Sequence, residues 1–255
     1  MGQVMYHAGD FWGAVCGRAD RRSGMPDPLS VAMSLREYGE SFPGLEQYGF
    51  RLGVGLSVSL TFGRLRAALT RLGSENPDIN VRWIEAESPA LIADVAGSRL
   101  DLAFVHGDPA PTGCRSELLW AERLLVALPE AHPLARENAL ARSDLRRERF
   151  LVAEADESGA GAALVQRALE GRPASLVSAP VQRETLMSLV ALGQGLAITP
   201  ACALGAFYPG VAYRPFEGRQ PFLPVHCAWR TDNEKPELKA FVDPIIEVAR
   251  REAGR

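Results

Sequence analysis

Lysine is nearly missing from this 255-residue sequence, in which Lys235 and Lys239 are the only two lysines. Lysine and arginine together number 28 against 31 aspartate and glutamate residues, so the formal net charge is −3. A surface that binds nucleic acid needs a basic excess, because bound phosphates must be neutralised by cations. The charge balance does not indicate a nucleic-acid groove, and we expect no specific DNA binding by this chain alone.

The sequence also lacks the cysteine and histidine spacings of metal sites and disulfide frameworks. Its four histidines show neither H-x-x-x-H nor H-E-x-x-H spacing, so we expect no metal ion. A P-loop is missing as well, and we expect no cofactor. The cysteines form no C-x-x-C pair, which favours reduced thiols packed as small apolar side chains; they are Cys16, Cys114, Cys202 and Cys227.

Long apolar runs are missing too. None approaches the roughly 18 residues that a membrane-spanning helix needs. The apolar run 11–16 is too short for the apolar region of a signal peptide. We therefore expect a cytoplasmic protein without membrane contact. Hydrophobic residues nevertheless make up 47% of the chain, which is enough for a sizeable core and excludes wholesale disorder.

The periodicity of the chain changes near Arg51. Residues 1–48 show little periodicity, and we expect them to be a partly disordered lead-in. From Arg51 onward, short apolar runs alternate with segments whose apolar residues recur at helical spacing, which is typical of an α/β fold. The predicted strands cover 51–56, 79–83, 100–105, 124–128, 150–153, 174–177, 195–199 and 222–230, and the predicted helices cover 62–72, 88–95, 158–170, 183–192 and 238–245.

Several motifs follow one another in the order and spacing of one protein family. They are Arg51-Leu52-Gly53-Val54-Gly55, Pro77-Asp78-Ile79, Gly97-Ser98-Arg99-Leu100-Asp101-Leu102-Ala103-Phe104, Leu124-Leu125-Val126-Ala127-Leu128-Pro129 and Leu189-Val190-Ala191-Leu192-Gly193-Gln194-Gly195-Leu196-Ala197-Ile198-Thr199-Pro200. In this order, residues 51–250 resemble the effector-binding domain of LysR-type transcriptional regulators. Regulators of this family begin with a winged helix-turn-helix, whereas residues 1–50 show no helix-turn-helix pattern.

The resemblance implies a two-lobed fold like that of type 2 periplasmic binding proteins. This fold is α/β, with mixed, mostly parallel sheets and a hinge of two crossover strands. We expect lobe I to comprise residues 49–121 plus 229–251, and lobe II to comprise residues 122–228. A small-molecule effector would bind in the cleft between the lobes.

Polar residues gather where predicted strands run into helices. Ligands of open α/β sheets bind beyond the carboxyl ends of the strands, and helix N-termini offer free N–H groups to anions. By resemblance, a serine of the first junction binds the effector's carboxyl group, and Ser88 matches a second effector position. The planar guanidinium of Arg183 can also donate two hydrogen bonds to a carboxylate, so an organic acid is expected as the effector. The candidate effector-binding residues are Ser57, Val58, Ser59, Ser88, His106, Glu154, Ser158, Arg183 and Thr185.

Five of these residues also have a purely structural interpretation. The three serines Ser57, Ser59 and Ser88 could each cap a helix, because serine is a favoured N-cap residue. His106 could be a strand-end histidine whose hydrogen bonds are satisfied within the fold. Arg183 could be a solvated charge or the partner of a nearby carboxylate. The sequence leaves these alternatives open.

Two other function classes fit the same fold. A solute-binding protein would carry an export signal, which the sequence does not show. An enzyme could use Ser57 as nucleophile and His226 as base, but the run 53–59 lacks the G-x-S-x-G pattern of a nucleophile elbow. The resemblance therefore favours a sensor domain that is not an enzyme.

Residues 60–73 and 79–85 are the expected interface of a homodimer or higher oligomer. The strand that carries Trp83 is expected at a sheet edge, and an unprotected edge invites pairing or cover. Ala67 and Ala68 are small enough for another helix to approach closely. By resemblance, effector domains pair side by side and antiparallel, and we expect Ala68→Glu to split this dimer while the lobe stays folded.

Overall fold

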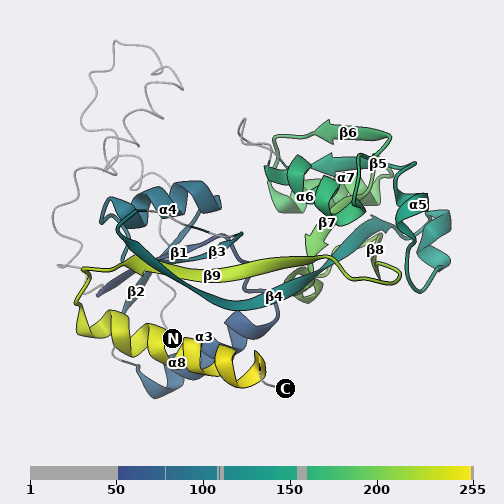
Figure 1. The fold of residues 1–255 in the computed structure, drawn as a ribbon. Coiled ribbons are helices and arrows are strands. Elements are labelled where there is room, and N and C mark those ends of the chain that lie inside the picture. The colour runs from purple at the N-terminus through teal and green to yellow at the C-terminus, as the bar shows by residue number, and fades with distance from the viewer. Residues whose placement is uncertain (1–50, 78, 108, 110–111, 154–159, 254–255) are drawn as a thin grey trace, which may run out of the picture. The chain divides into compact units, whose positions relative to one another are not determined.

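The computed structural model describes residues 51–253 apart from 78, 108, 110–111 and 154–159. The chain divides into two units, 1–48 and 49–255, and the first, the expected lead-in, lies outside the described residues. The second unit is an α/β fold, as predicted (Figure 1). The part of the chain that is described contains no helix both long and apolar enough to cross a membrane.

Strands and helices alternate along most of the second unit. The strands are β1 (Leu52–Leu56), β2 (Val81–Glu85), β3 (Leu102–His106), β4 (Cys114–Pro129), β5 (Arg149–Val152), β6 (Ser175–Ser178), β7 (Ala197–Pro200), β8 (Val211–Pro215) and β9 (Phe222–Arg230). The α-helices are α3 (Arg64–Glu75), α4 (Ser88–Ala96), α5 (Arg142–Leu145), α6 (Ala160–Leu169), α7 (Arg183–Ala191) and α8 (Pro236–Ala253). Two 3₁₀ turns, η2 (Pro133–Arg136) and η3 (Ala201–Gly205), complete the order.

Lobe I is a sheet covered by helices on both faces. Its strand order is β2-β1-β3-β9-β4, with β1 parallel to both β2 and β3. Helices α3 and α8 lie on one face and α4 lies on the other (Figure 1). Along β3, Phe104 packs with α3 and α8, whereas Val105 packs with α4. A strand that is buried on both faces needs a continuous run of apolar residues, and the sequence of β3 contains such a run.

The two crossover strands, β4 and β9, belong to both lobes. They pair antiparallel from Cys114 opposite Arg230 to Arg123 opposite Phe222, and from Leu124 onward β4 pairs with β7 and β8 instead. Figure 1 shows the two strands running side by side from lobe I into lobe II. A single antiparallel ladder therefore connects the lobes as a hinge.

Lobe II repeats this arrangement around the end of β4. Val126 packs in the core that α6 covers, whereas its neighbour Ala127 packs in the core that α7 covers. Arg142 of α5 donates a hydrogen bond at 3.0 Å to the carbonyl of Ala168, which lies in the last turn of α6. Its guanidinium also stacks 5.3 Å from the centre of the Phe216 ring. These contacts satisfy carbonyls that a helix end leaves without intrahelical partners.

Two expectations about the strands need correction. The sheets are mixed, as expected, but not mostly parallel, because β4 and β9 pair antiparallel with all of their neighbours. The strand expected at 124–128 begins at Cys114, and β8 was not expected at all. The first half of β4 crosses the hinge with irregular burial, so it lacks the alternation that predicts a strand.

The structure places the two parts of the expected dimer surface differently. Strand β2 lies at the sheet edge, as predicted, and Trp83 on it is 44% exposed. Ala68, in contrast, is buried in the lobe I core that α3 and α8 share. The helix that approaches Ala68 is therefore α8 of the same chain, and Ala68→Glu would disrupt the lobe rather than split a dimer. Ala67 is exposed.

Two glycines should respond oppositely to the same substitution. A Cβ at Gly55 would lie 2.8 Å from Leu91 Cδ2 and 3.2 Å from Ala103 Cβ, whereas a Cβ at Gly73 in α3 meets nothing within 4 Å. Gly55→Ala should destabilise the protein by about 1–3 kcal/mol through overpacking. Gly73→Ala should stabilise it by about 0.4–1 kcal/mol, because alanine has less freedom to lose on folding. Urea unfolding measures both, and a neutral Gly55→Ala would contradict the packing of β1 against α4.

Candidate functional site

Three predicted site residues meet at the carboxyl ends of the lobe I strands. The hydroxyl oxygens of Ser57, after β1, and Ser88, at the start of α4, lie 2.8 Å apart in a hydrogen bond. The backbone N–H of His106, at the end of β3, donates to the Ser57 hydroxyl at 3.2 Å. Because β1, β2 and β3 are parallel, their carboxyl ends share one edge, and this edge is where open α/β sheets bind ligands.

Helix capping by these serines, the structural alternative, is wrong. The N-cap residues of α3 and α4 are Gly63 and Glu87, and neither helix has a side-chain cap hydrogen bond. The Ser57 and Ser88 hydroxyls bond to each other instead. Two hydroxyls carry two protons and use one between them, so the pair keeps one donor for a ligand.

His106 and Arg183 interact across the two lobes. Burial lowers the pKa of His106 to about 4, the positive charge of Arg183 lowers it as well, and a hydrogen bond to the Ser57 backbone opposes both. The imidazole is therefore neutral at pH 7. Its Nε2 atom is buried and has no hydrogen-bond partner among the described residues, so the alternative of a histidine satisfied within the fold is wrong.

Arg183 begins α7, and its charge also acts on lobe II residues that the sequence patterns did not single out. Burial raises the pKa values of Cys202, Tyr208 and Tyr213, and the positive charge of Arg183 opposes that rise in each case. The hydroxyl oxygen of Tyr213 is buried without a hydrogen-bond partner among the described residues. Tyr213 escaped prediction because it lies on β8, a strand that no pattern indicated, and not at a strand-to-helix junction.

The remaining candidates contribute less to this cluster. The Val58 side chain is buried in the lobe I core, so a ligand would meet its backbone. The Ser59 hydroxyl lies 3.0 Å from that of Thr61. Thr185 is exposed. Glu154 and Ser158 lie outside the described residues.

The described part of the chain holds no group of three histidine, cysteine, aspartate or glutamate side chains that could bind a metal ion. The interlobe residues offer a different chemistry. They combine one guanidinium with hydroxyl groups and a neutral imidazole, and no carboxylate of the described residues forms an ion pair with Arg183. Such a set suits an anion that also accepts neutral hydrogen bonds.

The low pKa of His106 should make stability depend on pH. The unfolded chain binds a proton near the ordinary pKa of 6.5, whereas the folded protein does so near pKa 4. The unfolded state thus holds more protons between these values, and stability falls as pH drops through this window. Replacing His106 by Gln should remove about 1–2 kcal/mol of the stability difference between pH 7.5 and pH 5.

Urea unfolding at both pH values tests this prediction. The matched control is His132→Gln, because His132 lies in lobe II, where its imidazole accepts a hydrogen bond from the Leu134 backbone. An unchanged pH dependence in the His106→Gln variant would contradict a buried, neutral imidazole.

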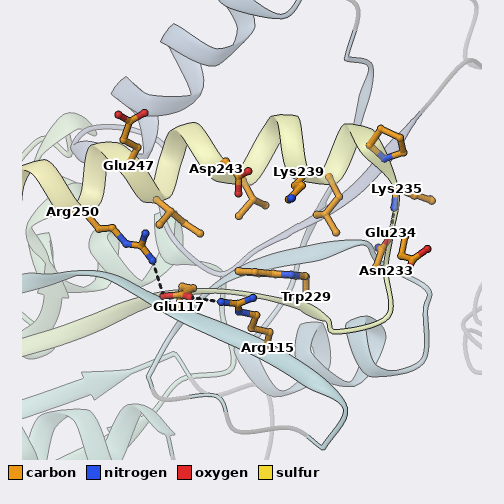
Figure 2. A pocket seen from close by; sticks show the side chains of 14 residues that line it. Arg115, Glu117, Trp229, Asn233, Glu234, Lys235, Lys239, Asp243, Glu247 and Arg250 are labelled. Atoms are coloured by element: carbon orange, nitrogen blue, oxygen red, sulfur yellow. Dashed lines mark hydrogen bonds and ion pairs between the residues drawn. The ribbon is translucent and has the colours of Figure 1, made fainter.

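A cavity lies entirely within lobe I, apart from the interlobe residues. A groove of about 700 Å³ runs between α8, the start of β4 and the end of β9, and Figure 2 shows its side chains. Glu117 lies 3.4 Å from Arg115 and 3.8 Å from Arg250, and Arg115 stacks 5.9 Å from the Trp229 ring. Cations and carboxylates alternate along the groove, so it shows no preference for a ligand of either charge.

The comparisons with known proteins agree on one family. The model of the LysR substrate binding domain matches residues 46–250. The chain is 31% identical over 200 residues to the Hca operon transcriptional activator HcaR of Escherichia coli, covering 77% of this chain and 67% of that protein. It is 28% identical over 203 residues to a probable cat1 operon transcriptional activator of Acinetobacter lwoffii, covering 77% and 66%. The chain thus spans about two thirds of the length of these relatives.

Solved structures share the fold. The BenM effector binding domain with its effector benzoate has a TM-score of 0.69 at 20% identity, over 80% of this chain and 94% of that one. The effector binding domain of QuiR in complex with shikimate has a TM-score of 0.67 at 16% identity, over 78% and 97%. The fold is therefore the two-lobed one that the resemblance implied. With the family model matching most of its length, the chain belongs to the family of LysR substrate-binding domains, the effector-binding domains of LysR-type transcriptional regulators.

Proposed function

We propose that this domain binds a small organic acid between its lobes and acts as the ligand sensor of a cytoplasmic transcriptional regulator. The observation that carries the proposal is the Ser57, Ser88 and His106 cluster of lobe I, on whose imidazole the positive charge of Arg183 from lobe II acts. Arg183 would bind the carboxylate, and the serine pair would donate its remaining proton.

The chemistry of related ligands supports a carboxylate. Benzoate in BenM and shikimate in QuiR are both carboxylates bound by effector binding domains of this fold. A carboxylate accepts bidentate hydrogen bonds from a guanidinium, and it gains further from hydroxyl donors. The neutral imidazole of His106 would then contact an uncharged part of the ligand.

The proposed mechanism is a shift between lobe arrangements. We propose that residues 49–121 plus 225–251 move as lobe I and residues 122–224 as lobe II, about the β4–β9 hinge. The expected boundary at residue 228 is moved because Val225 and Cys227 pack in the lobe I core and pair with β3. An effector signals only if it binds one arrangement better than another, and typical coupling energies are about 1–3 kcal/mol. Contacts from both lobes to one ligand provide that difference.

Catalysis is the weaker proposal for this site. The Ser57 hydroxyl contacts Ser88 and the backbone N–H of His106, and neither group can act as a general base toward it. The relatives are named as transcriptional activators. We therefore propose that the domain is not an enzyme.

Substitutions at the proposed site should weaken ligand binding. Arg183→Gln should reduce the affinity for the bound carboxylate by about 1.5–3 kcal/mol, the value of a hydrogen bond to a charged group. Ser57→Ala and Ser88→Ala should each cost about 0.5–2 kcal/mol. Calorimetry with benzoate, shikimate and a panel of other small carboxylates measures these losses.

Matched controls separate the site from the rest of the surface. Arg172→Gln removes an exposed arginine next to α6, and Ser188→Ala removes an exposed serine of α7. Both should bind the ligand as the wild type does. If Arg183→Gln binds as tightly as Arg172→Gln, the carboxylate binds elsewhere.

We further propose that the domain forms a homodimer through β2 and the exposed face of α3. The unpaired edge of β2 is the argument, together with Trp83, whose ring is partly exposed while it packs 6.2 Å from the Phe241 ring. Exposed residues of α3, such as Ala67, flank this edge. An edge strand of this kind is normally covered in the working protein.

The dimer proposal is tested with two charged variants. Ala67→Glu should place like charges at a two-fold interface and shift the protein from dimer to monomer in light scattering at tens of micromolar. Ala93→Glu, on the exposed side of α4, should leave the dimer intact. A wild type that is monomeric, or an Ala67→Glu variant that stays dimeric, would disprove this interface.

A further inference from the structure

The two lobes also touch directly between the loop that follows β1 and the 3₁₀ turn η3, which packs beside β4. The hydroxyl of Thr61, in the loop between β1 and α3, donates to the carbonyl of Cys202 in η3 at 2.8 Å. The backbone carbonyl of Thr61 accepts a hydrogen bond from the Arg66 side chain at 2.6 Å. The Thr61 hydroxyl oxygen lies 3.0 Å from the Ser59 hydroxyl oxygen. The lobe I side of the contact is therefore held in place by its own loop and helix.

Gly205 makes this contact close enough to exclude any side chain. A Cβ on Gly205 would lie 2.3 Å from the carbonyl oxygen of Thr61 and 2.6 Å from the Cβ of Phe62. The nearest of these atoms belongs to backbone, so no rotamer change relieves the clash. The backbones of η3 and the 57–63 loop thus lie against each other, and a residue larger than glycine would push them apart.

Cys202 is enclosed by the same contact. Its side chain is 3% exposed, and a Cβ on Gly63 of lobe I would lie 3.6 Å from the Cys202 Cβ. Burial raises the pKa of its thiol to about 12, and a hydrogen bond to Glu122 raises it as well. A backbone hydrogen bond from Ser59 of lobe I acts in the opposite direction. The Cys202 thiol therefore lies between the lobes, and separation of the lobes would expose it.

We propose that Thr61 and the Cys202–Gly205 turn form a latch that holds the two lobes together. The crossover strands alone leave rotation about the hinge free, whereas this third contact fixes one lobe arrangement. Opening the latch breaks the Thr61 hydrogen bond and exposes the Cys202 thiol. The closed state needs glycine at position 205.

The loop that carries Thr61 also carries two of the proposed ligand-binding residues. Ser57 and Ser59 lie in the same short loop as Thr61, so a ligand that shifts this loop changes the contact with η3. This step rests on the proposed function, because it needs a ligand at Ser57. The latch itself does not, and it is tested without any ligand.

The reactivity of Cys202 reports the latch directly. The full chain is treated with iodoacetamide, and the rate of modification at each cysteine is measured by mass spectrometry. Thiols react as thiolates from open states, so the rate follows the open population and the local pKa. Gly205→Ala should raise the Cys202 rate at least about tenfold, and Thr61→Val, which keeps the shape but removes the hydroxyl, should raise it about threefold.

Three controls make the result specific. Cys227, buried in the lobe I core, should stay protected in every variant, and the partly exposed Cys114 should keep its wild-type rate. Gly73→Ala adds the same methyl group at a site where it meets nothing within 4 Å, and it should not change the Cys202 rate.

Several results would overturn the latch. Equal Cys202 rates in the wild type and in both latch variants would show that the contact does not hold the lobes. A parallel rise at Cys227 would show general unfolding instead of lobe separation. If Gly205→Ala fails to fold, Thr61→Val alone decides. Failure to bind carboxylates would overturn the proposed function and leave these rates unaffected, so the two failures are distinguishable.

Discussion

The antiparallel pairing of β4 with β9 is the interaction on which both lobes depend. Each strand begins in one lobe and ends in the other, so the ladder from Cys114 to Arg123 on β4 supplies an edge of the lobe I sheet and the path into lobe II. Backbone hydrogen bonds of a ladder resist stretching but allow twisting, and a two-stranded ribbon twists more than a wide sheet. The lobes can therefore change their relative angle without losing either core.

The chemistry between the lobes follows from burial more than from charge. The imidazole of His106 and the hydroxyl of Tyr213 are buried in their neutral forms, and Arg183 supplies positive charge beside them. Arg183 is partly buried, and a partly buried cation without a carboxylate partner among the described residues gains from a ligand or water that replaces its hydration. The fold thus keeps an anion-binding group in a place where it is satisfied best by a bound molecule.

The groove of about 700 Å³ in lobe I is not the place where this chemistry gathers. The groove along α8 is lined by residues of lobe I alone, and its charges largely compensate one another through pairs such as Arg115 with Glu117. Between the lobes, Gly205 lies against Thr61, and this contact encloses Cys202. The interlobe residues, in contrast, include the buried polar atoms His106 Nε2 and Tyr213 Oη, which have no hydrogen-bond partner among the described residues.

Local sequence patterns determined which segments form strands and helices, because apolar periodicity and breaker residues act over a few positions. Strand β9 was predicted at its observed bounds, and Ser57, Ser88 and His106 were placed at strand ends, where they lie together. Only the tertiary structure decided that Ser57 bonds to Ser88 and not to a helix end, that Ala68 faces α8, and that Gly205 meets Thr61. These contacts join residues that are distant in the chain, and they depend on how helices and lobes pack, which no local pattern encodes.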